Sequence, residues 1–144
     1  MSDRIEDSFE MTELSEASEI PEDQEFSLMT YHVITTQRAE NLMEEYLSYI
    51  VLKKRNMQAA DAVSIDYDET VDRLSDMAGS LKICDDEDLK QRGIRKIFMK
   101  RHDYVLLYRI GGDNKDIAYV EAVYHTLQDY ENIFKRDVLD DIEE

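Results

Sequence analysis

The chain has 144 residues, which is enough for one compact domain and too few for two domains of ordinary size. Its single cysteine, Cys84, excludes an internal disulfide framework and fits a reducing compartment. The net charge of −17 is the main objection to a nucleic-acid target, so its distribution along the chain matters.

Most of the acidity lies at the two ends of the chain. Residues 1–26 carry a net charge of −9 and residues 137–144 carry −5, whereas the body between them carries only −3. The body is therefore nearly balanced, and its charge does not exclude a nucleic-acid partner.

The sequence indicates a soluble protein of the cytoplasm. No stretch approaches the roughly 18 apolar residues that span a bilayer, and the N-terminus lacks the basic and apolar regions of a signal peptide. We therefore expect no membrane partner. Cys84 stands next to Asp85 and Asp86, whose charges disfavour a thiolate, so a nucleophilic role for it is not expected.

Residues 1–28 form an acidic segment that we separate from a domain at 29–144. The segment buries too little apolar surface to offset its ordering entropy, which favours a disordered leader. Alternatively, Ile5, Phe9 and Ala17 are spaced by multiples of four and allow a weak amphipathic helix. Such a helix could lie on a basic groove of the same chain or of a neighbouring one.

The first half of the domain predicts a strand followed by two helices. Residues 31–35 form a short β-rich run, and Thr35 or Thr36 supplies the N-cap of the first helix. Asn56 marks a break, after which apolar residues at helical spacing indicate a second helix over about 60–81. The two helices are expected to form a hairpin.

The second half predicts a β-meander and a closing helix. An acidic loop at 85–88 precedes strands at 94–99, 104–110 and 116–124, and a helix follows over about 126–142. The fold class is therefore α+β: a small antiparallel β-meander packed on an N-terminal helical hairpin, with a C-terminal helix.

Basic residues gather around the first strand of the meander. Six of them fall within twelve positions, namely Lys90, Arg92, Arg95, Lys96, Lys100 and Arg101. Strand alternation places Arg95 with Ile97 toward the core, whereas Lys96 lies on the opposite face and should project from the sheet. These residues are either an ordinary polar strand face or a groove that contacts phosphates or the acids of a partner.

Among the three histidines, His125 is the best candidate for chemistry. It ends the last strand beside a polar turn, where a general acid or base could act, although a capping role is the alternative. His32 is interpreted as structural, and His102 as a solvated turn residue. No His or Cys pair has metal-ligand spacing and no Gly-rich phosphate loop is present, so the sequence predicts neither a metal nor a cofactor.

Three runs of the meander together resemble a known toxin family. They are GIRKI at 93–97, YVLLYRI at 104–110 and VEAVYHTLQDY at 120–130, and they resemble the C-terminal meander of RelE/ParE toxins. The run YHVI at 31–34 and the helical run at 39–50 are similar to the first strand and helix of that family. The resemblance covers about residues 30–135.

This resemblance implies the toxin component of a bacterial type II toxin–antitoxin system. Members of the superfamily either cleave mRNA on the ribosome or, in the ParE branch, poison DNA gyrase. An antitoxin tail wraps the toxin and blocks it, so a hetero-oligomer with the cognate antitoxin is expected.

The residue matches to the nuclease members are partial. Lys96 matches a lysine of the nuclease strand and His125 resembles a late histidine, but Phe98 and Val105 replace two expected basic residues. The resemblance implies a metal-independent endoribonuclease with His125 as acid or base and with Lys96 and Arg109 at the scissile phosphate. The residues implied to contact nucleic acid or antitoxin are Lys90, Arg92, Arg95, Lys100, Arg101, Tyr104, Gln128 and Tyr130.

Three functions follow as hypotheses. The first is growth inhibition by ribosome-dependent mRNA cleavage, which the surviving Lys96 and His125 support. The second is a ParE-like binding toxin that acts on DNA gyrase, and the third is an inactive relative restrained by its acidic N-terminal segment. The missing basic residues of the nuclease set favour the second and third.

Overall fold

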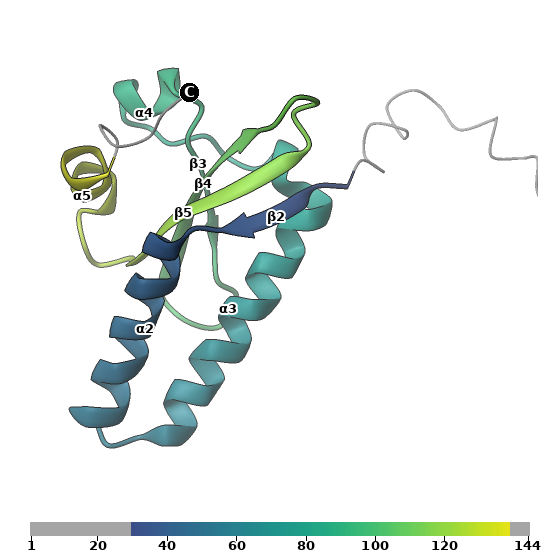
Figure 1. Ribbon diagram of the computed structural model, residues 1–144. Coiled ribbons are helices and arrows are strands. Elements are labelled where there is room, and N and C mark those ends of the chain that lie inside the picture. Colours follow the sequence, from purple (N-terminus) through teal and green to yellow (C-terminus); the bar gives the residue numbers. More distant parts are fainter. Residues whose placement is uncertain (1–29, 139–144) are drawn as a thin grey trace, which may run out of the picture.

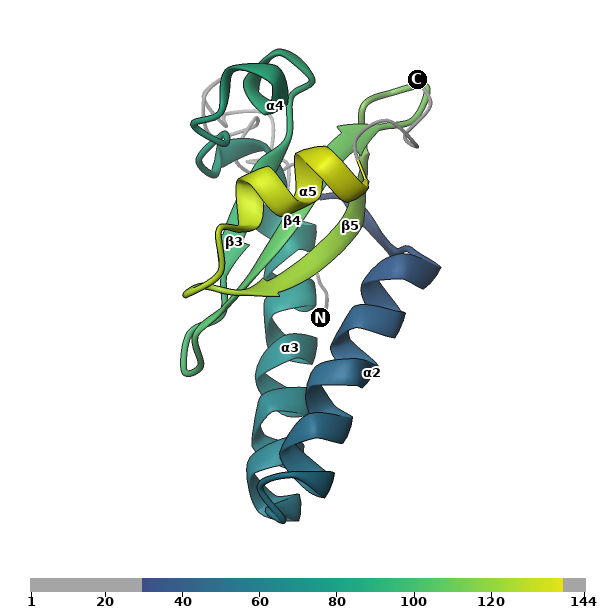
Figure 2. The same ribbon diagram turned by 90° about the vertical axis from the view of Figure 1, so that its left-hand side faces the viewer.

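The computed structural model describes residues 30–138 and confirms the predicted α+β architecture. A four-stranded sheet carries a helical hairpin on one face and a short C-terminal helix on the other (Figure 1; Figure 2). The predictions for residues 1–28 and for a helix beyond 138 fall outside the described residues. Within 30–138, none of the helices combines the length and the apolar character needed to cross a bilayer.

The sheet has the strand order β2-β5-β4-β3. Strands β3 (Arg95–Phe98), β4 (Tyr104–Gly111) and β5 (Ile117–His125) form the predicted antiparallel meander. Strand β2 (His32–Thr35) adds to its edge, parallel to β5. A parallel pair needs a long crossover, and the helical hairpin lies within that crossover.

The hairpin consists of α2 (Gln37–Leu52) and α3 (Met57–Met77), and it extends well past the sheet (Figure 1). The Thr36 side chain accepts the Ala39 N–H at 3.1 Å, which confirms one of the two predicted caps. Asn56 ends the turn between the helices and caps α3. A 3-10 turn, η2 (Ala78–Ser80), follows α3.

Two predicted boundaries are wrong. Helix α4 (Glu87–Gln91) occupies part of the predicted acidic loop, because Asp86 caps its N-terminus. The last helix, α5 (Tyr130–Asp137), begins four residues later than predicted. A turn precedes it, in which the Gln128 N–H donates to the His125 carbonyl at 3.0 Å.

A hydrophobic cluster lies on each face of the sheet, and the two clusters define the faces. Leu106 and Tyr108 pack with Met43 and Tyr67 on the side of α2 and α3, which we call the hairpin face. Leu107 and Phe134 lie in the second cluster, on the α5 face. Neighbouring residues of β4 thus point to opposite faces, as strand geometry requires.

Candidate functional site

Lys96 lies on the α5 face and is buried. Its side chain is only 6% exposed, and its ammonium lies 2.9 Å from a Glu131 carboxylate oxygen and 3.4 Å from the Tyr130 hydroxyl. The prediction that Lys96 projects from the sheet is therefore wrong, because the first turn of α5 covers it. Burial lowers the pKa of Lys96, but the hydrogen bonds to Glu131 and Tyr130 outweigh burial and the pKa is raised.

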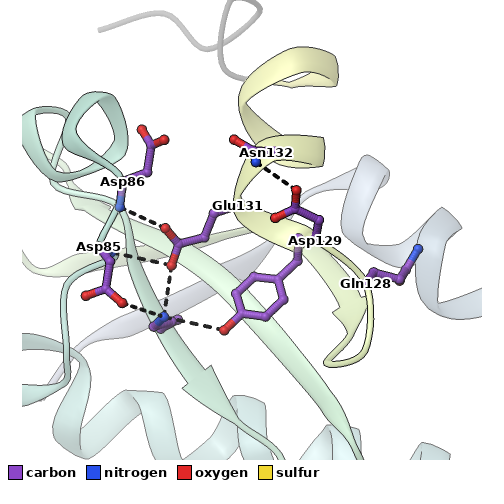
Figure 3. A pocket seen from close by; sticks show the side chains of 8 residues that line it. Asp85, Asp86, Gln128, Asp129, Glu131 and Asn132 are labelled. Carbon is purple, nitrogen blue, oxygen red and sulfur yellow. Dashed lines mark hydrogen bonds and ion pairs between the residues drawn. The ribbon is translucent and has the colours of Figure 1, made fainter.

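Glu131 ties α5 to the loop that precedes α4. Its carboxylate accepts the Asp86 N–H at 2.8 Å and the Asp85 N–H at 3.4 Å (Figure 3). Burial raises the pKa of Glu131, but the hydrogen bond from Lys96 and the two backbone donors outweigh it and the pKa is lowered. The ion pair therefore persists at neutral pH.

The pocket around this pair, of about 470 Å³, has an acidic rim. Its lining residues are Asp85, Asp86, Lys96, Gln128, Asp129, Tyr130, Glu131 and Asn132. Four of these residues are acids and one is a lysine; Lys96 is already paired with Glu131, and Asp86 is paired with Lys135 of α5. This arrangement repels a phosphate.

Arg109 also pairs with a buried carboxylate, which it shares with Arg38. Its Nε lies 2.9 Å from an oxygen of Glu121, whose side chain is 5% exposed, and Arg38 pairs with the other oxygen at 3.3 Å. The Arg109 guanidinium also lies 4.3 Å from the centre of the Tyr119 ring. These contacts fix the orientation of the Arg109 guanidinium, with Nε as the donor to Glu121.

The other predicted basic residues have separate positions. Arg95 donates to the Leu81 carbonyl at 2.6 Å on the hairpin face. Among residues 30–138, Lys90, Arg92 and Lys100 are exposed and form no ion pair. Arg101 pairs with Glu69.

His125 lies on the hairpin face, opposite to Lys96. Its ring packs edge-on against Tyr104 with the ring centres 5.2 Å apart, and its Nδ1 accepts the Leu127 N–H at 3.1 Å. The neutral ring therefore carries its proton on Nε2. Gln128 Oε1 accepts both the His125 N–H at 2.9 Å and the Tyr46 hydroxyl at 2.7 Å, which fixes the end of β5.

The structure does not bring the three predicted catalytic residues together. Lys96 lies under α5, His125 lies on the opposite face, and Arg109 pairs with Glu121 farther along β4. Of the predicted contact residues, Tyr130 is hydrogen-bonded to Lys96, whereas Tyr104 lies with His125.

Sequence reasoning missed a pair formed by Asp66 of α3 and His102 of the β3–β4 loop. Asp66 is 1% exposed, and its Oδ2 accepts His102 Nδ1 at 2.8 Å and the Arg101 N–H at 2.9 Å. Burial raises the pKa of Asp66, but the hydrogen bonds from His102 and Arg101 outweigh it, so the pKa is lowered. The signal was available: Asp66 stands on the apolar stripe of α3, between Val63 and Tyr67.

His102 and His125 line one pocket, of about 390 Å³. Its lining residues are Ile50, Lys54, Asn56, Ala59, Val63, Arg101, His102, Asp103, Tyr104 and His125. They come from the α2–α3 turn, the β3–β4 loop and the end of β5. We call this cavity the histidine pocket.

Cys84 is fully buried, and the expectation that it is no nucleophile is supported. Burial, followed by the nearby Glu131 carboxylate, raises the pKa of its thiol to about 12. Such a thiol stays protonated at neutral pH.

The comparisons agree with the fold described above. The family model "ParE toxin of type II toxin-antitoxin system, parDE" matches residues 33–130. The chromosomal ParDE system of P. aeruginosa includes a chain with 17% identity and a TM-score of 0.53, and the match covers 67% of this chain and 96% of that one. A chain of the RelBE2 complex from Mycobacterium tuberculosis has 23% identity and a TM-score of 0.43, covering 67% and 92%. No curated protein matches the sequence.

Proposed function

Because the chain belongs to the ParE toxin family of type II toxin–antitoxin systems, we propose that it inhibits growth by binding DNA gyrase. A cognate antitoxin would bind the toxin and block it. The competing function is cleavage of mRNA by the three catalytic residues predicted from the sequence, and the experiment below tests between the two. The separation of Lys96, Arg109 and His125 carries the argument.

Metal-independent cleavage of RNA requires a base for the 2′-hydroxyl, a proton donor for the leaving oxygen and positive charge at the phosphate, all within a few ångströms. His125 lies on the hairpin face, whereas Lys96 lies beneath α5. Arg109 donates from Nε to Glu121, farther along β4. The arrangement therefore supports a toxin that acts by binding.

The burial of Lys96 gives a second argument. Exposing its ammonium to RNA would require α5 to release both the Glu131 ion pair and the Tyr130 hydrogen bond. In the nuclease members that the sequence resembles, the lysine that matches Lys96 would have to contact the phosphate directly. In this chain Lys96 instead stabilises the docking of α5.

The test measures both activities on one preparation. The purified full-length chain is added to gyrase with relaxed plasmid and ATP, and separately to a translation extract whose mRNA 5′ ends are mapped. We expect loss of supercoiling, its restoration by the cognate antitoxin, and intact mRNA. Undisturbed supercoiling together with mRNA cleavage that His125→Ala abolishes would overturn the proposal.

A further inference from the structure

The end of the helical hairpin is an exposed surface, which we call the hairpin tip. It consists of residues 49–60, which form the last turn of α2, the connecting turn and the first turn of α3. The tip projects past the sheet, and the other elements within residues 30–138 leave its end uncovered (Figure 1; Figure 2). Residues 52–58 are all exposed. The described part of the chain therefore leaves this surface open to a partner.

Half of the large apolar side chains that residues 30–138 leave exposed lie at the hairpin tip. Tyr49 is 55% exposed, Leu52 is 71% exposed and Met57 is 65% exposed. Tyr49 and Leu52 are three positions apart on α2 and therefore share one side of that helix. Met57 opens α3 across the turn. Apolar side chains that gather on a surface in this way indicate an interaction site.

The hairpin tip also carries positive charge. Residues 46–60 include Lys53, Lys54 and Arg55 and contain no acid. None of these three cations forms an ion pair within residues 30–138. A partner that suits the tip therefore combines apolar side chains with carboxylates.

The acids near the tip offset only part of this charge. Asp103 of the β3–β4 loop lines the histidine pocket together with Lys54 and has no ion pair within the described residues. The other acids of that region are directed elsewhere, since Asp66 binds His102 and Glu69 binds Arg101. Along the two helices the nearest acids, Glu45 and Asp61, lie outside the tip. Three cations thus remain against one unpaired acid of the loop.

The acidic N-terminal segment of this chain, residues 1–28, has the complementary composition. It holds ten acids and a single base, Arg4. Apolar side chains, among them Ile5, Phe9 and Leu14, stand between the acids. The segment therefore offers both kinds of group that the hairpin tip leaves without a partner.

The segment is also long enough to reach the tip of its own chain. It joins the domain at the far end of α3, where the Tyr31 N–H donates to the Ser75 carbonyl at 2.7 Å. Helix α3 has 21 residues, so the tip lies about 30 Å from this point. Residues 15–29 span up to about 50 Å when extended. The apolar and acidic residues before position 15 can therefore lie on the tip.

We propose that the acidic N-terminal segment docks on the hairpin tip of its own chain, with its carboxylates on Lys53, Lys54 and Arg55 and its apolar side chains on Leu52 and Met57. The docked segment withholds the tip from other partners until one of them displaces it. This goes beyond the proposed function, because the contact lies within the chain. The covalent link gives the segment an effective concentration on the order of 1 mM, so weak contacts are sufficient.

The test attaches a spin label to Ser8→Cys in the full-length chain. The native Cys84 is fully buried and the pKa of its thiol is raised to about 12, so it stays unlabelled. Methyl NMR then measures the relaxation enhancement at Leu52 and Met57 and, for comparison, at Ile117. Because Ile117 pairs with His32, close to where the segment joins the domain, an undocked segment would affect Ile117 most. We expect the opposite order, with an enhancement at the tip that falls as salt is raised.

Two double variants with the same loss of charge test the cations of the tip. Lys53→Gln combined with Lys54→Gln should lower the enhancement at Met57 about threefold. Lys90→Gln combined with Arg92→Gln removes two exposed, unpaired cations at α4, at the opposite end of the molecule (Figure 1). This control should leave the enhancement unchanged.

A second pair of variants tests the apolar part of the contact. Leu52→Gln should lower the enhancement at Met57 about twofold. Leu127→Gln, at a leucine that is 89% exposed in the turn before α5, should leave it unchanged. All of these side chains are exposed, so the variants keep the fold.

A mixed sample separates docking within the chain from docking between copies. It contains spin-labelled chain without isotopes and isotope-labelled chain without a spin label, and we expect no enhancement in it. Enhancement in this sample would overturn docking within the chain. A stronger enhancement at Ile117 than at Met57, an equal effect of the α4 control, or no effect of Leu52→Gln would each overturn the proposed contact. Gyrase is absent from the experiment, so its outcome is independent of the proposed target.

Discussion

Basic side chains on the two faces of the sheet differ in whether they are paired with a carboxylate. On the α5 face, Lys96 is buried and paired with Glu131 in a pocket rimmed by acids. On the hairpin face, His102, His125 and Lys54 line a pocket in which the two histidine Nε2 atoms and the Lys54 ammonium have no partner among the described residues. On the α5 face a buried lysine holds a helix in place, and on the hairpin face Lys54 has no ion pair among residues 30–138.

This difference shows that the number of basic residues in a segment is a poor guide to an anion site. In the cluster at 90–101, Lys96 and Arg101 are paired with carboxylates from α5 and α3, whereas Lys90, Arg92 and Lys100 are exposed and have no ion pair among residues 30–138. Lys54 belongs to a shorter run and keeps its charge available. What matters is how many cations remain after the fold has satisfied its own acids.

The largest effect on the free energy of unfolding is expected from Glu131→Gln, which removes the ion pair with Lys96 on the α5 face. Glutamine keeps one oxygen, whereas the Asp85 and Asp86 N–H groups donate to different oxygens of Glu131, and it leaves the buried Lys96 without its main counter-charge. We expect the free energy of unfolding to fall by about 3 kcal/mol in urea titrations. As a control, Glu69→Gln at the exposed pair with Arg101 should change it little. Equal effects of the two variants would contradict the assigned role of the buried pair.

The second-largest effect on stability is expected at the Asp66–His102 pair, which orients one ring of the histidine pocket. Asp66→Asn removes the buried charge that orients His102, and we expect a loss of about 2 kcal/mol. The lowered pKa of Asp66 means that the carboxylate stabilises the fold above about pH 4, the ordinary value for an unfolded Asp. This contribution is lost as the pH falls through the folded-state pKa.

A second measurement on Asp66→Asn follows how the free energy of unfolding changes with pH. Urea titrations between pH 7 and pH 3 should show a smaller loss of stability for the variant than for the wild type, because one depressed carboxyl is gone. Parallel curves for the two proteins would show that Asp66 is not ionised in the fold. Glu131 and Asp86 also have lowered pKa values, so some acid dependence remains in the variant.

Local signals in the sequence were sufficient for most of the fold. The Thr36 cap and the break at Asn56 lie within a few residues of the helices they delimit, and the alternation around Ile97 gave the correct face for Lys96. The family model and the strand order agree with the predicted α+β fold and toxin family.

The parts that failed depend on contacts between distant segments. The partner of Lys96 lies 35 positions away, so no local pattern shows that α5 covers the lysine. The parallel pairing of β2 with β5 joins segments 85 positions apart. Asp66 is the exception, because a carboxylate on the apolar stripe of a helix already indicates a buried partner.

A smaller effect is expected at the end of β5. Gln128→Ala removes the acceptor shared by the Tyr46 hydroxyl and the His125 N–H, at a site open to solvent. We expect a loss of about 1 kcal/mol and faster hydrogen exchange of the His125 amide. Unchanged exchange would show that the turn is fixed by Leu127 and His125 alone. Asn132→Ala, which removes only a local bond to Asp129, is the matched control.

The smallest effect on stability is expected at Lys54, in the turn between α2 and α3. Lys54 is exposed and has no ion pair within the described residues, so Lys54→Gln should change the free energy of unfolding by less than about 0.5 kcal/mol. Lys115→Gln should behave alike in urea titrations. Lys115 lies in the β4–β5 turn and serves as the matched control. A loss of stability with Lys54→Gln would instead make Lys54 part of the scaffold, as Lys96 is on the other face.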